Sequence, residues 1–222
     1  MSDLDNQSTG KVTLLANKIW TTLTNRGFEP PLRRGDHPAD RYEALTGEPA
    51  PAEAAALWSV LGGRDVFGLC FESAWSAGEL CDARATEAEF SGPGVPYEEL
   101  DGSVADSVRM VWWDRGWCPV MATADIAFAI DTNPGATGHR GQIIFCTLHE
   151  DCDREAVWDS LADFLRDVLT AVSSDGLIIE NGFGQFAHTD GYNRSVPISI
   201  LEVGRAHRDG RGIQLLGLGD AV

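Results

Sequence analysis

The stretch VRMVWWDRGWCPVMATADIAFAIDTNPGATGHRGQIIFCTLHEDCDREAVWDSLADFLRDVLTAV, residues 108–172, decides the fold. Its first part consists of apolar runs of strand length, each closed by a turn signal: Val108–Trp113, Cys118–Ala122, Ile126–Asp131 and Gln142–Leu148. Short turns of this kind join antiparallel neighbours. Its last part has apolar residues at helical spacing, which predicts a helix over Asp153–Val172. We therefore expect a helix packed on a sheet.

The predicted helix has two contrasting faces. The apolar face is expected to lie on the sheet and carries Val157, Leu161, Phe164, Leu165, Val168 and Leu169. The other face is expected to be solvated and carries Glu155, Asp159, Asp163, Arg166 and Asp167.

Further elements are predicted on both sides of this stretch. On the N-terminal side, helical spacing and stop signals predict helices over Thr9–Arg26, His37–Leu45 and Ala52–Leu61, followed by a strand over Val66–Phe71. On the C-terminal side, short strands are expected at Ile178–Ile179, Val196–Val203 and Ile213–Leu218. Between the last two of these strands lies a small basic patch of Arg205, His207, Arg208 and Arg211.

The charge of the chain excludes some partners. The 222 residues include 34 acidic and 17 basic side chains, which gives a net charge of −17. A field of this sign repels nucleic-acid phosphates and anionic lipids. We therefore expect no nucleic acid and no membrane among the partners, and either a basic protein partner or a role in solubility alone.

The acidic residues are concentrated in one region, an insert over residues 72–107. From Glu72 to Val108 there are nine acidic residues and one basic residue, Arg84, so the local charge is 1 − 9 = −8. We expect a short helix, Ser76–Glu87, followed by an exposed loop. The insert is either a solvated loop or an electrostatic landing site for a basic protein. The candidate contact residues are Glu79, Asp82, Glu87, Glu89, Glu98, Glu99, Asp101 and Asp106.

No catalytic signature is found, and we expect neither an enzyme nor a cofactor. Cys146, His149 and Cys152 form a weak metal candidate, because thiolate and imidazole are zinc ligands but a fourth ligand is missing. Asp131 with Asn133 could also supply polar ligands, although such residues more often close a turn by bonding their own backbone. Asp114 has the same interpretation. An enzyme site without a recognised signature, near His188 and Asp190, is kept as a further hypothesis.

The environment of the protein is expected to be cytoplasmic. No apolar run reaches the roughly 18 residues of a membrane span, and residues 1–11 do not resemble a secretory signal. The five cysteines are odd in number and none forms a CxxC pair, so they are expected to be buried apolar groups. The adjacent Trp112 and Trp113 face opposite sides of a strand. One is expected in the core and the other, if exposed, is a candidate binding anchor, although packing in the core or between elements is favoured for both.

The order of these elements resembles the SUKH superfamily, which contains the Smi/Knr-type cell-wall-assembly regulators and many bacterial relatives. HPADRYEALTGEPAPAEAAALWSVLGG, residues 37–63, is similar to the family's opening pair of helices. Three later segments look like its core and closing helix: WCPV at 117–120, DTNP at 131–134 followed by GQII at 141–144, and SLADFL at 160–165. The matching residues look like fold determinants: Trp117, Pro119, Asp131, Pro134, Gly141, Gln142, Ser160, Phe164 and Leu165.

This resemblance implies an α+β fold with a mostly antiparallel sheet packed against helices. It divides the chain into an N-terminal helix and linker (1–36), a SUKH-like domain (37–172) and a C-terminal extension (173–222) packed on the same domain. It implies a non-enzymatic role, most often that of a bacterial immunity protein that binds and neutralises a cognate toxin. Because nuclease toxins carry basic sites, an acidic inhibitor would suit one. The alternative is a regulatory or scaffold protein with an endogenous protein partner.

Overall fold

The computed structural model describes residues 3–28, 38–61, 106–111, 113–122, 126–147, 153–175, 177–180, 183–189, 195–198 and 200–211. Its helices are α1 (Asp3–Asn25), α2 (Pro38–Thr46), α3 (Ala52–Leu61), α5 (Leu161–Ser173) and α6 (Ile200–Arg208). Its strands are β1 (Trp117–Ala122), β2 (Ile126–Asp131), β3 (Ile143–Thr147), β4 (Arg154–Trp158), β5 (Leu177–Glu180), β6 (Phe183–Thr189) and β7 (Ser195–Ile198). The predicted strands at 66–71 and 213–218 and the predicted helix at 76–87 lie outside the described residues.

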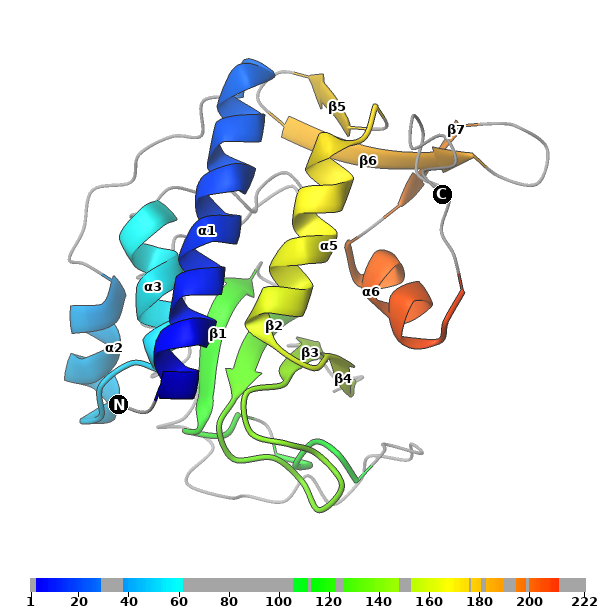
Figure 1. Cartoon of the computed structure of the whole chain (residues 1–222). Coiled ribbons are helices and arrows are strands. Elements are labelled where there is room, and N and C mark those ends of the chain that lie inside the picture. The colour runs from blue at the N-terminus through cyan, green and yellow to red at the C-terminus, as the bar shows by residue number, and fades with distance from the viewer. Residues whose placement is uncertain are drawn as a thin grey trace.

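The central sheet is antiparallel and has the strand order β1-β2-β3-β4. Helices α1 and α5 lie side by side over one face of this sheet, and α3 lies on the other side of α1 (Figure 1). The second sheet, β5-β6-β7, lies near the C-terminal end of α5. These layers confirm the α+β fold class. None of the described helices is both long and apolar enough to cross a lipid bilayer.

The main core forms where the sheet meets the helices. In β2 and β3, alternate side chains such as Phe128 and Phe145 point toward α1 and α5, because successive strand residues face opposite sides. The rings of Phe128 and Phe164 are stacked with centroids 5.9 Å apart, and Trp158 meets Phe164 edge-on at 4.9 Å. Such aromatic pairs add about 1 kcal/mol to the free energy gained by burial alone.

The opposite face of the sheet is also buried. Ala127 and Ala129 of β2 lie there in a second cluster with Trp113 and Trp117, whose rings meet edge-on at 5.4 Å. Burial on both faces explains why β2 is apolar from Ile126 to Ile130 rather than alternating. The predicted strand at Val108–Trp113 is wrong for the residues described there, because Val111 forms one isolated bridge and its neighbours form a turn and loop over this face.

The predicted long helix at Asp153–Val172 is wrong in its first third. Residues 154–158 form strand β4, which pairs antiparallel with β3, and the helix begins only at Leu161. Ser160 is the N-cap, and its hydroxyl accepts a hydrogen bond of 3.2 Å from the amide of Asp163. Val157 and Trp158 reach the core equally well from a strand, so the apolar spacing alone does not distinguish the two structures.

The C-terminal part differs from the expectation in a similar way. The predicted strand at Val196–Val203 is correct for β7 but wrong from Ile200, where α6 begins. Helix α6 packs against β4 and α5 and buries Ile200, Val203, Gly204 and Ala206. The four buried positions recur at helical spacing, so a helix places them on one face. A strand would divide them between its two faces.

Two glycines inside helices provide a matched test of this packing. A Cβ atom at Gly10 of α1 would have no neighbour within 4 Å, whereas one at Gly204 of α6 would lie 2.2 Å from Cζ2 of Trp158. We expect Gly10→Ala to stabilise the protein by about 0.5–1 kcal/mol through helix propensity. Gly204→Ala should instead destabilise it by about 1–3 kcal/mol through overpacking. Urea unfolding of both variants would check this; equal shifts of the same sign would contradict the packing of α6 on Trp158.

Candidate functional site

A buried carboxylate lies at the end of β2. Asp131 is fully buried, and its two carboxylate oxygens accept hydrogen bonds from the amide of Asn133 (2.9 Å) and the side chain of Gln142 (2.9 Å). Burial raises the pKa of Asp131 above its ordinary value, and the hydrogen bonds from Gln142 and Asn133 offset part of this rise. The carboxylate is enclosed by donors of its own loop, so it serves the fold rather than a ligand.

Gln142 connects this carboxylate to a second loop. Its side-chain amide group donates to Asp131 and to the carbonyl oxygen of Ser107 (2.8 Å), and its side-chain oxygen accepts from the amide of His139 (3.2 Å). Both of its N–H groups and its oxygen are therefore satisfied, as a buried amide requires.

Asn133 links Asp131 to a second acidic residue, Asp114. The side chain of Asn133 donates to both carboxylate oxygens of Asp114, at 3.2 and 3.1 Å. Asp114 also accepts from the amide of Gly116 (2.7 Å) and from Arg109 (2.6 Å). The turn interpretation of Asp131 and of Asp114 is thus confirmed, since each carboxylate bonds the backbone two residues further on.

This network fixes the point at which the acidic insert rejoins the sheet. The carbonyl oxygens of Asp106 and Ser107 accept hydrogen bonds from the amides of Thr137 (3.1 Å) and Gly135 (3.1 Å). A Cβ atom at Gly135 would lie 2.2 Å from the oxygen of Asp106, so only glycine allows this approach. Asp106 itself is exposed. The other predicted contact residues lie outside the described residues: Glu79, Asp82, Glu87, Glu89, Glu98, Glu99 and Asp101.

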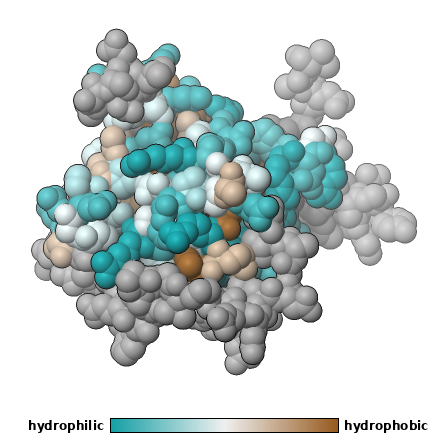
Figure 2. Space-filling model, turned by 90° about the horizontal axis from the view of Figure 1, so that it is seen from below, coloured by the Kyte–Doolittle hydropathy of each residue, from teal (hydrophilic) through white to brown (hydrophobic). Residues whose placement is uncertain are grey.

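The surface around this junction is polar. Figure 2 shows the molecule from below the view of Figure 1, where the described residues form a largely hydrophilic face with small apolar areas. The loop after β2 contributes the exposed Thr137, His139 and Arg140 to the surface. Such a face suits recognition by charge and hydrogen bonds more than by a large apolar patch.

The residues of the family resemblance occupy three places. Asp131 ends β2, and Pro134, Gly141 and Gln142 belong to the loop between β2 and β3. Trp117 and Pro119 lie in β1, and both are buried. Ser160 caps α5, in which Phe164 and Leu165 are fully buried. The structure thus brings the first group together at the loop between β2 and β3, places Trp117, Phe164 and Leu165 in the two cores, and uses Ser160 as a helix cap.

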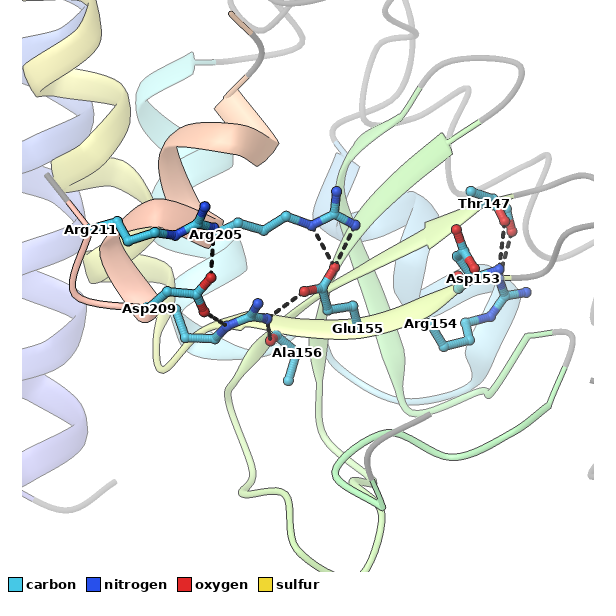
Figure 3. Close-up of polar contacts among 9 residues, drawn as sticks. Thr147, Asp153, Arg154, Glu155, Ala156, Arg205, Asp209 and Arg211 are labelled. Atoms are coloured by element: carbon cyan, nitrogen blue, oxygen red, sulfur yellow. Dashed lines mark hydrogen bonds and ion pairs between the residues drawn. The ribbon is translucent and has the colours of Figure 1, made fainter. Parts of the chain in front are cut away.

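A second polar cluster joins α6 to β4 and was not predicted. Glu155 of β4 forms ion pairs with Arg205 (2.6 Å) and Arg208 (2.5 Å) of α6, and Figure 3 shows Arg205 reaching across to Glu155. Asp209 pairs with Arg208 and with Arg211. The basic patch expected from the sequence is therefore largely neutralised within the chain. Its acidic partner Glu155 lies 50 residues away in sequence, so helical spacing alone could not reveal it.

Asp167 also differs from its predicted place on a solvated face. It is 8% exposed, and its carboxylate accepts a hydrogen bond from the indole N–H of Trp158 at 2.8 Å. The Nδ1 atom of His207 lies 3.0 Å from the same oxygen. Helix α6 covers this side of α5, which is why an acidic residue of the outer face becomes buried.

The candidate sites for other chemistry remain without support in the described part of the chain. Cys146 is fully buried in β3, while His149 and Cys152 lie outside the described residues. No group of three His, Cys, Asp or Glu side chains suited to a metal occurs among the described residues. His188 lies in β6, opposite Val196 of β7, and Asp190 is not described. Trp113 is buried, and the side chain of Trp112 is not described.

The loop network predicts a large effect for Gln142→Leu. This change leaves the buried Asp131 carboxylate without one of its two donors, which should reduce the free energy of unfolding by about 2–4 kcal/mol. Thr137→Ala is the control in the same loop, because the Thr137 side chain is exposed, and it should change stability by less than about 0.5 kcal/mol. Chemical denaturation measures both; a Gln142→Leu variant as stable as the control would refute the role of the network.

The α6 cluster predicts a pH-dependent contribution to stability. Burial acts to raise the pKa of Glu155, but hydrogen bonds and charge from Arg205 and Arg208 outweigh it and lower the pKa. The stabilisation of the folded state by Glu155 is therefore fully present above the ordinary glutamate pKa. It is lost as the pH falls through the lowered pKa that Glu155 has in the folded protein. We expect Glu155→Gln to cost about 1 kcal/mol at pH 7, with the difference from the unmodified protein vanishing in acid. The control is Glu43→Gln, because Glu43 is exposed on α2. A stability difference between Glu155→Gln and the unmodified protein that did not change with pH would contradict the pairing of Glu155 with the two arginines.

Comparison with known proteins agrees with this architecture. The model of the SMI1/KNR4 family (SUKH-1) matches residues 40–167, which is more than half of the 222-residue chain. No curated protein matches the chain. Members of this family are in general non-enzymatic protein-binding modules that act in immunity or regulation. The match extends from α2 to the middle of α5 and includes the hydrogen-bonded loop around Asp131. The chain belongs to the SMI1/KNR4 (SUKH-1) family.

Proposed function

We propose that this protein is an immunity protein that neutralises a cognate toxin by direct binding in the cytoplasm, without catalysis. The observation that carries the proposal is the local charge of −8 between Glu72 and Val108, in a chain of net charge −17 that belongs to a family of protein-binding modules. Membership of this family implies a protein partner, and the negative charge implies that this partner is basic.

The partner that fits this charge is a basic toxin domain, and a nuclease is the toxin class that fits it best. A nuclease must hold a polyanion, so the surface around its catalytic site carries lysines and arginines. An acidic protein can occupy that surface in place of the substrate. Complementary charge raises the association rate most, and this gain falls with ionic strength.

The hydrogen-bonded loop supports this use of the insert. Ordering of side chains and loops at an interface costs free energy, and this cost is smaller where a contact segment is already held in place. Asp106 is exposed, while its carbonyl oxygen is held by Thr137 and the neighbouring Ser107 by Gln142. The C-terminal end of the insert, Asp106 and Ser107, is therefore held at a defined position beside a polar surface.

The proposal is tested by affinity purification of the tagged protein from its host, followed by mass spectrometry at 0.15 M and 0.5 M salt. We expect one basic toxin domain, with recovery reduced at the higher salt because the Debye length shortens from about 8 Å toward 4 Å. The contact surface is then tested by replacing Glu87, Glu89, Glu98, Glu99 and Asp101 with Lys, which should weaken binding at least about 100-fold.

The matched control reverses acidic residues elsewhere on the surface. Asp40, Glu43, Glu48, Asp159 and Asp175 are five exposed acidic residues outside the insert, and their replacement by Lys should reduce affinity less than about fivefold. Equal effects of the two variants would show that net charge matters but the insert is not the contact. Recovery of wall-synthesis or signalling proteins in place of a toxin would favour the regulatory role over immunity.

A further inference from the structure

Gln142 joins the buried carboxylate of Asp131 to Ser107, the last residue of the acidic insert. We propose that Asp131 and Gln142 form a proton-sensitive latch on this end of the insert. The ionised carboxylate holds the side-chain amide of Gln142 in the orientation that binds Ser107, and protonation of the carboxylate reverses the amide and releases Ser107. The latch concerns the protein alone, and only its use in releasing a partner rests on the proposed function.

The orientation of the Gln142 amide is fixed from both sides. Its nitrogen donates to the carboxylate of Asp131 (2.9 Å) and to the carbonyl oxygen of Ser107 (2.8 Å), and its oxygen accepts from the backbone amide of His139 (3.2 Å). A reversed amide would place its oxygen at the carbonyl of Ser107 and its N–H groups at the N–H of His139, where neither can form a hydrogen bond. The present orientation therefore satisfies all three neighbours only while Asp131 presents an acceptor.

The carboxylate of Asp131 is surrounded by donors. It is fully buried, and both of its hydrogen-bond partners in the described part of the chain donate to it: the backbone amide of Asn133 on one oxygen and Gln142 on the other. A protonated carboxyl group carries one O–H that requires an acceptor. The backbone amide of Asn133 can only donate, whereas Gln142 can turn its oxygen toward the O–H. Protonation therefore acts on Gln142 and, through it, on Ser107.

Burial favours the protonated form of Asp131. It raises the pKa of this carboxyl group above its ordinary value, and the negative charge of Asp114 adds to the rise, whereas hydrogen bonds from Gln142 and Asn133 oppose it. Because the pKa is raised in the folded protein, the stabilisation by this group is fully present below the ordinary aspartate pKa. It is lost as the pH rises through the raised pKa. The folded chain therefore accepts the proton without unfolding, and the change stays local to the contacts of Gln142.

The other charged groups near Asp131 are paired elsewhere or exposed. Asp114 pairs with Arg109 at 2.6 Å. On the face of the sheet that Asp131 shares, the buried guanidinium of Arg154 lies 5.9 Å from the ring centroid of Trp117. The remaining charged or titratable side chains of residues 106–116 and 132–142 are exposed: Asp106, Arg115, His139 and Arg140. Among the described carboxylates, it is thus Asp131 that contacts Gln142.

Two backbone amides report on the state of the latch. The amide of Gly135 donates to the carbonyl oxygen of Ser107, and the amide of Thr137 donates to that of Asp106, both at 3.1 Å. When Gln142 releases Ser107, this end of the insert loses its shortest described bond to the loop and separates from it more often. Both amides then exchange their hydrogen with solvent faster.

The test compares the unmodified full-length protein with Asp131→Asn, whose neutral side chain presents an N–H donor where the protonated carboxyl has its O–H. Hydrogen exchange of the native protein, followed by NMR, gives the protection factors of the Gly135 and Thr137 amides. We expect both to be at least about tenfold lower in Asp131→Asn at pH 7, as the loss of one buried hydrogen bond predicts. In the unmodified protein they should fall by a similar factor on acidification, in step with the carboxyl carbon signal of Asp131.

The matched control is Asp159→Asn, which makes the same change of charge at an exposed position and should alter both protection factors less than about twofold. The proposal is wrong if Asp131→Asn keeps the protection of the unmodified protein. It is also wrong if protection in the unmodified protein does not follow the titration of Asp131, which decides the matter even if Asp131→Asn does not fold. A loss in the unmodified protein that extends to the amides of α5 contradicts it too, because the latch requires the fold to persist.

The use of the latch in partner release is measured separately. With the toxin domain recovered by affinity purification, Asp131→Asn should weaken binding at pH 7 by about threefold or more, because a contact segment that is no longer held must be ordered on binding. A latch that opens without this loss of affinity would overturn its role in partner release and leave the immunity function standing. Recovery of no toxin would count against the immunity function and leave the exchange results on the latch unchanged.

Discussion

The hydrogen bonds around the Asp131 carboxylate are the constraint on which this end of the molecule depends. A buried carboxylate costs several kcal/mol unless donors surround it, and here the donors come from the residues that form the loop between β2 and β3. Gln142 can serve Asp131 only when the loop returns to begin β3, so the same bonds fix the register of these two strands. Through Ser107, Gln142 also fixes the segment that follows the acidic insert. One buried charge therefore determines a turn, a strand pairing and the position of a surface segment.

The charges of the described chain fall into internal and external groups. Asp131, Asp114, Asp167 and Glu155 each have a partner within the fold. The arginines of α6 are engaged with Glu155 and Asp209, which leaves them less available to an external anion. Acidic side chains such as Asp40 and Asp106 are instead exposed. In the described part of the chain, negative charge that is not used inside the fold is thus carried by the surface.

Burial on both faces leaves little of the central sheet accessible from outside. Both faces of β2 and β3 are filled by side chains, one by the aromatic core around Phe128 and the other by the cluster around Trp117. In the described part of the chain, the polar residues of the loops satisfy one another. The exposed parts of the loops are then the places where charge and shape can vary without disturbing the core.

The sequence by itself determined the fold class, the strands β1 to β3, helix α3 and the turns at Asp114 and Asp131. Each of these follows from local rules: an apolar run of strand length, a glycine stop, or a carboxylate that bonds its own backbone. Only the tertiary structure decided that 154–158 is a strand, that 200–208 is a helix and that Asp167 is buried. Val157 and Trp158 satisfy a helical and an extended pattern equally well, and pairing with β3 selects the extended one. Asp167 and Glu155 look solvent-facing until α6, distant in sequence, covers them, because burial is a property of what packs on a residue and not of the residue itself.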